Sequence, residues 1–189
     1  NRVQNFMNYQ VTEQMPEYFD EFERMLFHLP LIGSAFKKLY YDATVKRPKS
    51  EFIPIDQFYV SYYATDLSNA DRYTHVIYRS PVEIQRDIRA GVYEDVELSS
   101  PSSDVGTSFS EKMDTIIGLS PTSGHDPQYV LLEQHCYLNI EDEDEACPYI
   151  VTVEQQSRQV LSIRRNYKQD DPNKEKVNHF VHYRFVPGF

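Results

Sequence analysis

Four β-rich runs in the last third of the sequence constrain the fold most strongly: QYVLLEQHCYLNIE, PYIVTVEQ, RQVLSIRRNY and NHFVHYRFVPGF. Their β-branched and aromatic residues are typical of strands, and short polar segments separate them. Only Gln155, Gln156 and Ser157 join the middle pair, which is a connection of hairpin length. The runs therefore predict an antiparallel meander late in the chain.

A helix is predicted over residues 13–28, because apolar residues recur there at spacings of three and four. This apolar face consists of Met15, Phe19, Phe22, Met25 and Leu26. Pro30 and Gly33 interrupt the pattern, and SAFKKLYYD then favours a strand.

A second, shorter helix is predicted over residues 81–90. Ser80 is a typical N-cap, Pro81 suits the first helical position, and Glu83 completes a capping box with Ser80. Gly91 is placed to end the helix.

The other segments are predicted from their turn and strand residues. We expect a turn over 44–49, extended structure in SEFIPIDQFYVSYYA that breaks at Pro54, and a strand in YTHVIYRS. Residues 99–127 are rich in Ser, Pro, Gly and Asp and predict a flexible excursion around one short amphipathic piece, EKMDTIIGL. With 189 residues, the chain is expected to form a single α+β domain, 1–189.

Charge limits the interactions that this chain can make. The formal net charge of -10 argues against a surface that wraps nucleic acid, since such binding relies on clustered Lys and Arg. Two readings stay open for the basic residues that do cluster: a local positive patch, or solvent-facing charges that keep sheet edges soluble. These residues are Lys37, Lys38, Lys46, Arg47 and Lys49, with Arg164 and Arg165 later in the chain.

Neither a signal peptide nor an apolar run of about 18 residues is visible, so we expect a soluble, intracellularly made protein that makes no membrane contact. Cys136 and Cys147 lie on what should be opposing strands, so their spacing leaves a disulfide open. Buried free thiols are the favoured reading.

The known metal-site patterns fit this sequence poorly. Asp142 and Asp144 alternate as in a calcium loop, but the glycine of such a loop is missing. Residues three apart on a strand face opposite ways, so His179 and His182 should not share a metal. Asp170 and Asp171 precede two lysines in QDDPNKEK, which is better explained as a connector around Pro172 than as a magnesium site.

Nucleophile patterns fit no better. Cys136 follows His135, and adjacent strand residues face away from each other. Core or surface packing is the favoured interpretation of the histidines, His125 among them. GxSxG, Walker and GxGxxG motifs are all missing from the sequence. The sequence therefore assigns no catalytic, cofactor-binding or metal-binding residue, and no cofactor.

Three segments carry a resemblance to a known family: LPLIGSAFKKLYYD, ATDLSNADRYTH and LSIRRNY…FVHYRFVPGF. In their order along nearly the whole chain, weakening at 99–127, they resemble the portal proteins of tailed bacteriophages, particularly the short-tailed type. The resemblance implies an α/β wing region that precedes the channel-forming helices of a longer protein.

The resemblance also implies a role and partners. The full protein would form a ring at the capsid vertex of the virion, after synthesis in the bacterial host cytoplasm, and DNA would pass through the ring during packaging and ejection. Expected partners are other portal subunits, terminase, capsid proteins and tail or adaptor proteins. This wing would have no specific DNA site and no enzymatic activity. The alternatives are a metal-dependent nucleic-acid-processing enzyme domain and a generic adaptor module.

Overall fold

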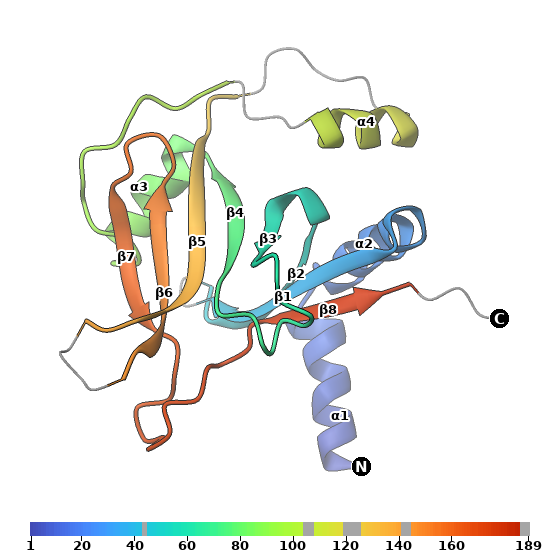
Figure 1. Ribbon diagram of the computed structural model, residues 1–189. Helices are drawn as coiled ribbons and strands as arrows, with labels where there is room; N and C mark the ends of the chain where they lie inside the picture. Colours follow the sequence, from blue (N-terminus) through green and yellow to red (C-terminus); the bar gives the residue numbers. More distant parts are fainter. Residues whose placement is uncertain (43–44, 104–107, 119–125, 141–144, 186–189) are drawn as a thin grey trace. The chain divides into compact units, whose positions relative to one another are not determined.

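A computed structural model describes residues 1–42, 45–103, 108–118, 126–140 and 145–185 (Figure 1). The chain separates into two compact units, residues 1–55 with 178–189 and residues 56–177. The single-domain expectation for residues 1–189 stays a prediction. The chain begins with a helix and its strands form two antiparallel sheets, so the predicted α+β class is confirmed.

The first unit combines helices with a three-stranded sheet. Its elements are α1 (Arg2–Tyr9), the π-helical turn η1 (Gln10–Gln14), α2 (Tyr18–Ile32), β1 (Ser34–Asp42), β2 (Arg47–Ile53) and β8 (Phe180–Arg184). β1 is central and pairs antiparallel with β2 and β8. The strand predicted from SAFKKLYYD is confirmed, and Gly33 ends α2 in a left-handed conformation with φ 82°.

The bounds of the predicted first helix, residues 13–28, differ from those observed. It begins at Tyr18 instead of residue 13, because Met15 precedes Pro16 and is held in a non-helical conformation with φ −120°. Pro30 lies inside α2, which continues to Ile32.

The predicted apolar face was also too wide. Met25 packs with Ala35 and Phe52, and this core is extended by Phe22, Leu29 and Tyr183. A stripe at positions 22, 25 and 29 leaves Phe19 and Leu26 on the flank of α2, where both side chains are exposed.

The second unit contains a five-stranded antiparallel sheet with strand order β3-β4-β5-β6-β7. Its strands are β3 (Phe58–Val60), β4 (Tyr73–Arg79), β5 (Tyr129–Leu138), β6 (Cys147–Glu154) and β7 (Val160–Arg165). A short 3-10 turn, η2 (Ile55–Gln57), precedes β3. The predicted β6–β7 hairpin is confirmed.

The fourth late strand does not extend this meander as predicted. β8 pairs with β1 in the other sheet. Residues 166–177 separate β7 from β8, and Asp171 closes a turn there by accepting hydrogen bonds from the backbone amides of Asn173 and Glu175. A connector of this length frees β8 from hairpin pairing with β7.

Helix α3 (Pro81–Arg89) forms with the predicted capping box. The Glu83 amide donates to Ser80 Oγ at 3.3 Å, and Glu83 Oε2 accepts from the Ser80 amide at 2.8 Å. Ile84 of α3 packs on Leu131 and Leu161 of the sheet.

Within the predicted excursion 99–127, the expected short helix is confirmed as α4 (Ser108–Ile117). Ser102 forms an isolated β-bridge with Gln128. The flexibility predicted for this stretch concerns in part residues 104–107 and 119–125, which lie outside the described residues.

Candidate functional site

The two lysines of the early basic cluster that lie on β1 are buried. Lys37 is 3% exposed, and its Nζ lies 4.5 Å from the ring centroid of Tyr18 and 5.4 Å from that of Phe22. Lys38 is 8% exposed and lies over Tyr40 and Phe180. Neither ammonium group is therefore presented on the surface.

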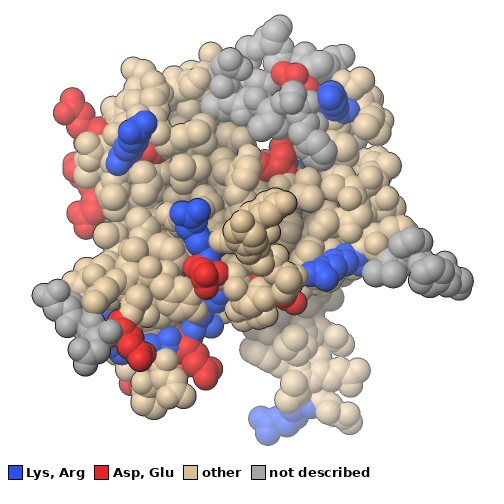
Figure 2. Space-filling model, viewed as in Figure 1, with Lys and Arg blue, Asp and Glu red and all other residues tan. Residues whose placement is uncertain are grey.

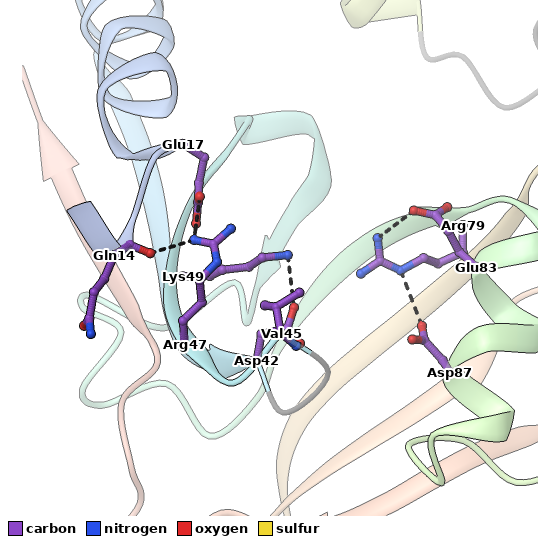
Figure 3. Close-up of polar contacts among 9 residues, drawn as sticks. All are labelled: Gln14, Glu17, Asp42, Val45, Arg47, Lys49, Arg79, Glu83 and Asp87. Carbon is purple, nitrogen blue, oxygen red and sulfur yellow. Dashed lines mark hydrogen bonds and ion pairs between the residues drawn. The ribbon is translucent and has the colours of Figure 1, made fainter. Parts of the chain in front are cut away.

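Two further members of the cluster form ion pairs (Figure 3). Arg47 Nη1 lies 2.7 Å from both carboxylate oxygens of Glu17 and 3.1 Å from the Gln14 carbonyl. Lys49 Nζ lies 3.0 Å from Asp42 Oδ2. These pairs join β2 to the N-terminal side of α2 and to the end of β1.

Neither reading left open for the early cluster, a positive patch or solvent-facing charges, fits Lys37 and Lys38, which are buried. Arg47 and Lys49 are paired, and Lys46 is exposed. Arg164 and Arg165 are exposed, and Arg164 Nη2 lies 3.8 Å from the buried Glu133 carboxylate. On the face in view in Figure 2, blue and red side chains are interspersed among uncharged ones.

Lys37 has an unusual electrostatic environment. Burial disfavours its charged form and lowers its pKa, and the nearby Glu21 carboxylate offsets part of this effect. Among the described residues its Nζ has no hydrogen-bond partner, so the two aromatic rings supply its closest stabilising contacts.

His135 belongs to a buried polar cluster on β5. Its Nδ1 faces the Asn166 amide group at 3.5 Å, and its Nε2 lies 3.1 Å from Glu133 Oε1. Because an amide N–H can only donate, Nδ1 accepts and Nε2 carries the proton toward Glu133. The ring also stacks on Tyr73, whose pKa is raised by burial and by Glu133 and Tyr137.

This cluster continues as a polar row across four strands. His75 of β4 pairs with Glu133, Glu133 with Thr152 of β6, and Thr152 with Ser162 of β7. All four residues are buried. This row could not be predicted from the sequence, because its members come from four separate strands and meet only through the sheet register.

The structure brings together one Ser–His pair that sequence reasoning missed. Ser34 Oγ lies 2.6 Å from His182 Nε2, while the Arg184 guanidinium donates to His182 Nδ1 at 3.3 Å. With Nδ1 accepting, the proton resides on Nε2, so this nitrogen donates to Ser34 and cannot remove its proton. The pair links β1 to β8 and lacks the orientation of a catalytic dyad.

The other candidate residues are not assembled into a site. Cys136 and Cys147 are free thiols, as predicted, and burial raises the pKa of Cys136. Lys176 lies in the connector predicted from QDDPNKEK, and its Nζ donates hydrogen bonds to the carbonyls of Leu67 and Ala70. His125, Asp142 and Asp144 lie outside the described residues.

Across the described ranges, no three His, Cys, Asp or Glu side chains gather closely enough to hold a metal ion. In the same ranges, no helix has both the length and the apolar character that a bilayer crossing requires. Neither a scan of protein-family models nor a search of curated proteins finds a match for this chain.

Proposed function

We propose that this chain is the wing region of a phage or prophage portal protein, a structural part of the head-to-tail connector. The observation that carries the proposal is the order of the segments LPLIGSAFKKLYYD, ATDLSNADRYTH and LSIRRNY…FVHYRFVPGF, which resembles that family over nearly the whole chain. The α+β class with antiparallel sheets is compatible with such a wing.

In the proposed assembly, copies of the longer protein form a closed ring at one vertex of the capsid. DNA passes through the channel of this ring during packaging and ejection. Terminase docks on the ring during packaging, and tail or adaptor proteins replace it afterwards. The wing has no reaction to catalyse, because the ATP hydrolysis that drives packaging belongs to the terminase.

The charge arrangement supports a peripheral position for this chain. Proteins that grip a duplex neutralise its phosphates with unpaired Lys and Arg. Here Arg47 and Lys49 are paired with Glu17 and Asp42, and Lys37 is buried under aromatic rings. A wing that never touches the DNA can use its basic residues in this way, to hold its own helix and strands together.

The two alternatives gain less support. A metal-dependent enzyme needs converging carboxylates, and in QDDPNKEK the Asp171 carboxylate instead closes a backbone turn. A generic adaptor module with no role in the ring would not be present in virus particles at the ratio of one ring per particle.

Quantitative mass spectrometry of purified particles tests the proposal. Particles induced from a host that carries the gene should contain peptides of this chain at a low, fixed ratio to the major capsid protein, as expected for one ring per particle. Complete absence of these peptides from DNA-filled particles would refute the proposal and favour an adaptor or enzyme that acts before assembly.

A further inference from the structure

Two hydroxyl groups in the buried polar row of the second unit have no hydrogen-bond partner among the described residues: Thr152 Oγ1 and Ser162 Oγ. The two residues lie on β6 and β7 and are 1% and 8% exposed. A hydroxyl that leaves water without gaining a partner destabilises the fold, so such groups are rare in folded proteins. Both hydroxyls therefore point to a partner that is not a protein group.

The two hydroxyls lie on the same face of the sheet. Thr152 and Ser162 are register partners in the adjacent antiparallel strands β6 and β7 (Figure 1). Residues directly opposed in this way have Cβ atoms about 4.5 to 5.5 Å apart. One small molecule between them can contact both oxygens, because two hydrogen bonds of the usual O–H···O length together span up to about 5.6 Å.

An irregularity in the strand ladder adjoins this pair. Thr152 pairs with Ser162, but the next residue of β6, Val153, pairs with Val160, so Leu161 is an extra residue on β7. Such a bulge bends its strand and disrupts the ladder locally. The departure from regular strand packing thus lies directly beside the two hydroxyls, where a small ligand needs room.

The neighbouring side chains separate this position from bulk solvent. Leu131 and His135 share the face of Glu133, since each is two residues from it on β5. On one side Leu131 packs with Leu161 in an apolar cluster, and on the other the His135 ring stacks on Tyr73. The polar row therefore lies between an apolar cluster and an aromatic pair, and a molecule held there is internal.

We propose that the hydroxyls of Thr152 and Ser162 bind an internal water molecule, with the Glu133 carboxylate as its third partner. Glu133 is the register partner of Thr152 on β5, and a carboxylate has about four acceptor sites. Water both donates and accepts, so it can accept from a hydroxyl while it donates to the carboxylate. Internal waters in proteins typically make about three hydrogen bonds.

The charges around Glu133 favour water over a metal cation as the ligand. The His135 imidazole faces Glu133 Oε1 at 3.1 Å, and Arg164 Nη2 lies 3.8 Å from Oε2. The guanidinium therefore already offsets the negative charge of the carboxylate. A cation would be repelled by Arg164, whereas neutral water would not. The inference is independent of the proposed function, because it concerns the interior of one unit.

Thermal denaturation of Thr152→Val tests the site, because valine replaces the hydroxyl by a methyl group of similar size. If the hydroxyl binds water, a hydrogen bond is lost and the melting temperature should fall by about 2 to 4 °C. If the hydroxyl has no partner, the same change removes a desolvation penalty and should raise the melting temperature. The sign of the shift thus decides between the two cases.

Two further variants sharpen this test. Ser162→Ala should also lower the melting temperature, and the double variant should lower it by less than the sum of the single shifts, because both hydroxyls bind the same water. Thr74→Val is the matched control, since Thr74 is half-buried and points to the opposite face of the sheet from its neighbour His75. This control should melt close to the parent chain.

A high-resolution crystal structure of the parent chain provides a second measurement that needs no variant to fold. It should show a water oxygen within hydrogen-bond distance of both Thr152 Oγ1 and Ser162 Oγ. Three results would overturn the inference: a higher melting temperature for Thr152→Val, a crystal structure in which both hydroxyls donate to protein carbonyls, or a melting temperature that rises with added Na⁺ or K⁺ in the parent but not in Thr152→Val, which identifies a cation.

Discussion

Lys37 shows how a single residue can turn a predicted surface feature into a structural one. From the sequence it belonged to a basic cluster, but in the structure it is 3% exposed beneath Tyr18 and Phe22. Its lowered pKa means that the folded protein binds fewer protons than the unfolded chain at alkaline pH. Stability should therefore rise as the pH increases from the folded pKa of Lys37 toward the unfolded value of 10.5.

Lys37→Met should increase the free energy of unfolding at pH 7 by about 1 kcal/mol, as for other replacements of a buried charge by an apolar side chain. The difference from the parent chain should shrink as the pH approaches 10.5, because the lowered pKa lets the folded parent lysine lose its proton before the unfolded one does. Urea denaturation between pH 7 and pH 10 measures both effects, with the exposed Lys168→Met as the control. A variant less stable than the parent at pH 7 would show that the cation–π contacts outweigh the desolvation.

Glu154, at the end of β6, differs from Lys37 because its surroundings favour its charged form. Burial alone would raise its pKa, but hydrogen bonds from Ser157, Gln156 and Ser99 outweigh burial and lower it. The carboxylate therefore stabilises the fold above its unfolded pKa of 4.5, and this contribution is lost as the pH falls through the folded pKa.

Glu154→Gln should lower the free energy of unfolding at pH 7 by about 1 to 3 kcal/mol, because the amide accepts these bonds less well. The loss should disappear in acid, once the parent carboxylate is protonated. Denaturation curves from pH 3 to pH 7 check this, with the exposed Glu175→Gln as the control. A loss of the same size at every pH would contradict the conclusion that the charged Glu154 carboxylate stabilises the fold.

At the scale of elements, the features that were predicted correctly depend on residues close together in the sequence. The capping box of α3 involves residues three apart, so its geometry follows once the helix starts. The β6–β7 hairpin likewise depends on a short connection. In contrast, β8 pairs with β1 across more than a hundred residues, and the strand pattern alone contains no information on that choice.

The same distinction, between local and long-range contacts, explains why the side-chain clusters of the candidate site were not predicted from the sequence. The Ser34–His182 pair joins positions 148 residues apart, and the buried polar row depends on the register of four strands. Pattern reasoning considered His182 only for a metal shared with His179, so it missed the contact. Local signals predict elements, whereas side-chain clusters require knowledge of the sheet order.

Ser80→Ala tests the element that was predicted best. Removal of the hydroxyl leaves the Glu83 amide without its acceptor, at a cost of about 0.5 to 2 kcal/mol. The denaturation midpoint should fall accordingly, while the exposed Ser68→Ala should leave it unchanged. An unchanged midpoint for Ser80→Ala would mean that the capping box contributes nothing.

At the scale of the whole molecule, the charge arrangement predicts poor DNA binding. With Lys37 and Lys38 buried and Arg47 and Lys49 paired, duplex DNA meets mainly a surface of net negative charge. Fluorescence anisotropy at about 150 mM salt should give a dissociation constant above about 1 µM, and this constant should rise further as salt is added. Tighter binding that survives this salt would argue for a nucleic-acid-binding module in place of a peripheral wing.

Electron microscopy of the protein expressed from its complete reading frame tests the central claim most directly. If this chain is a portal wing, the particles should be closed rings of uniform subunit number with an axial channel, and the two units described above should lie outside that channel. Single subunits or open filaments at micromolar concentration, with no closed ring in any buffer that keeps the protein folded, would contradict the account.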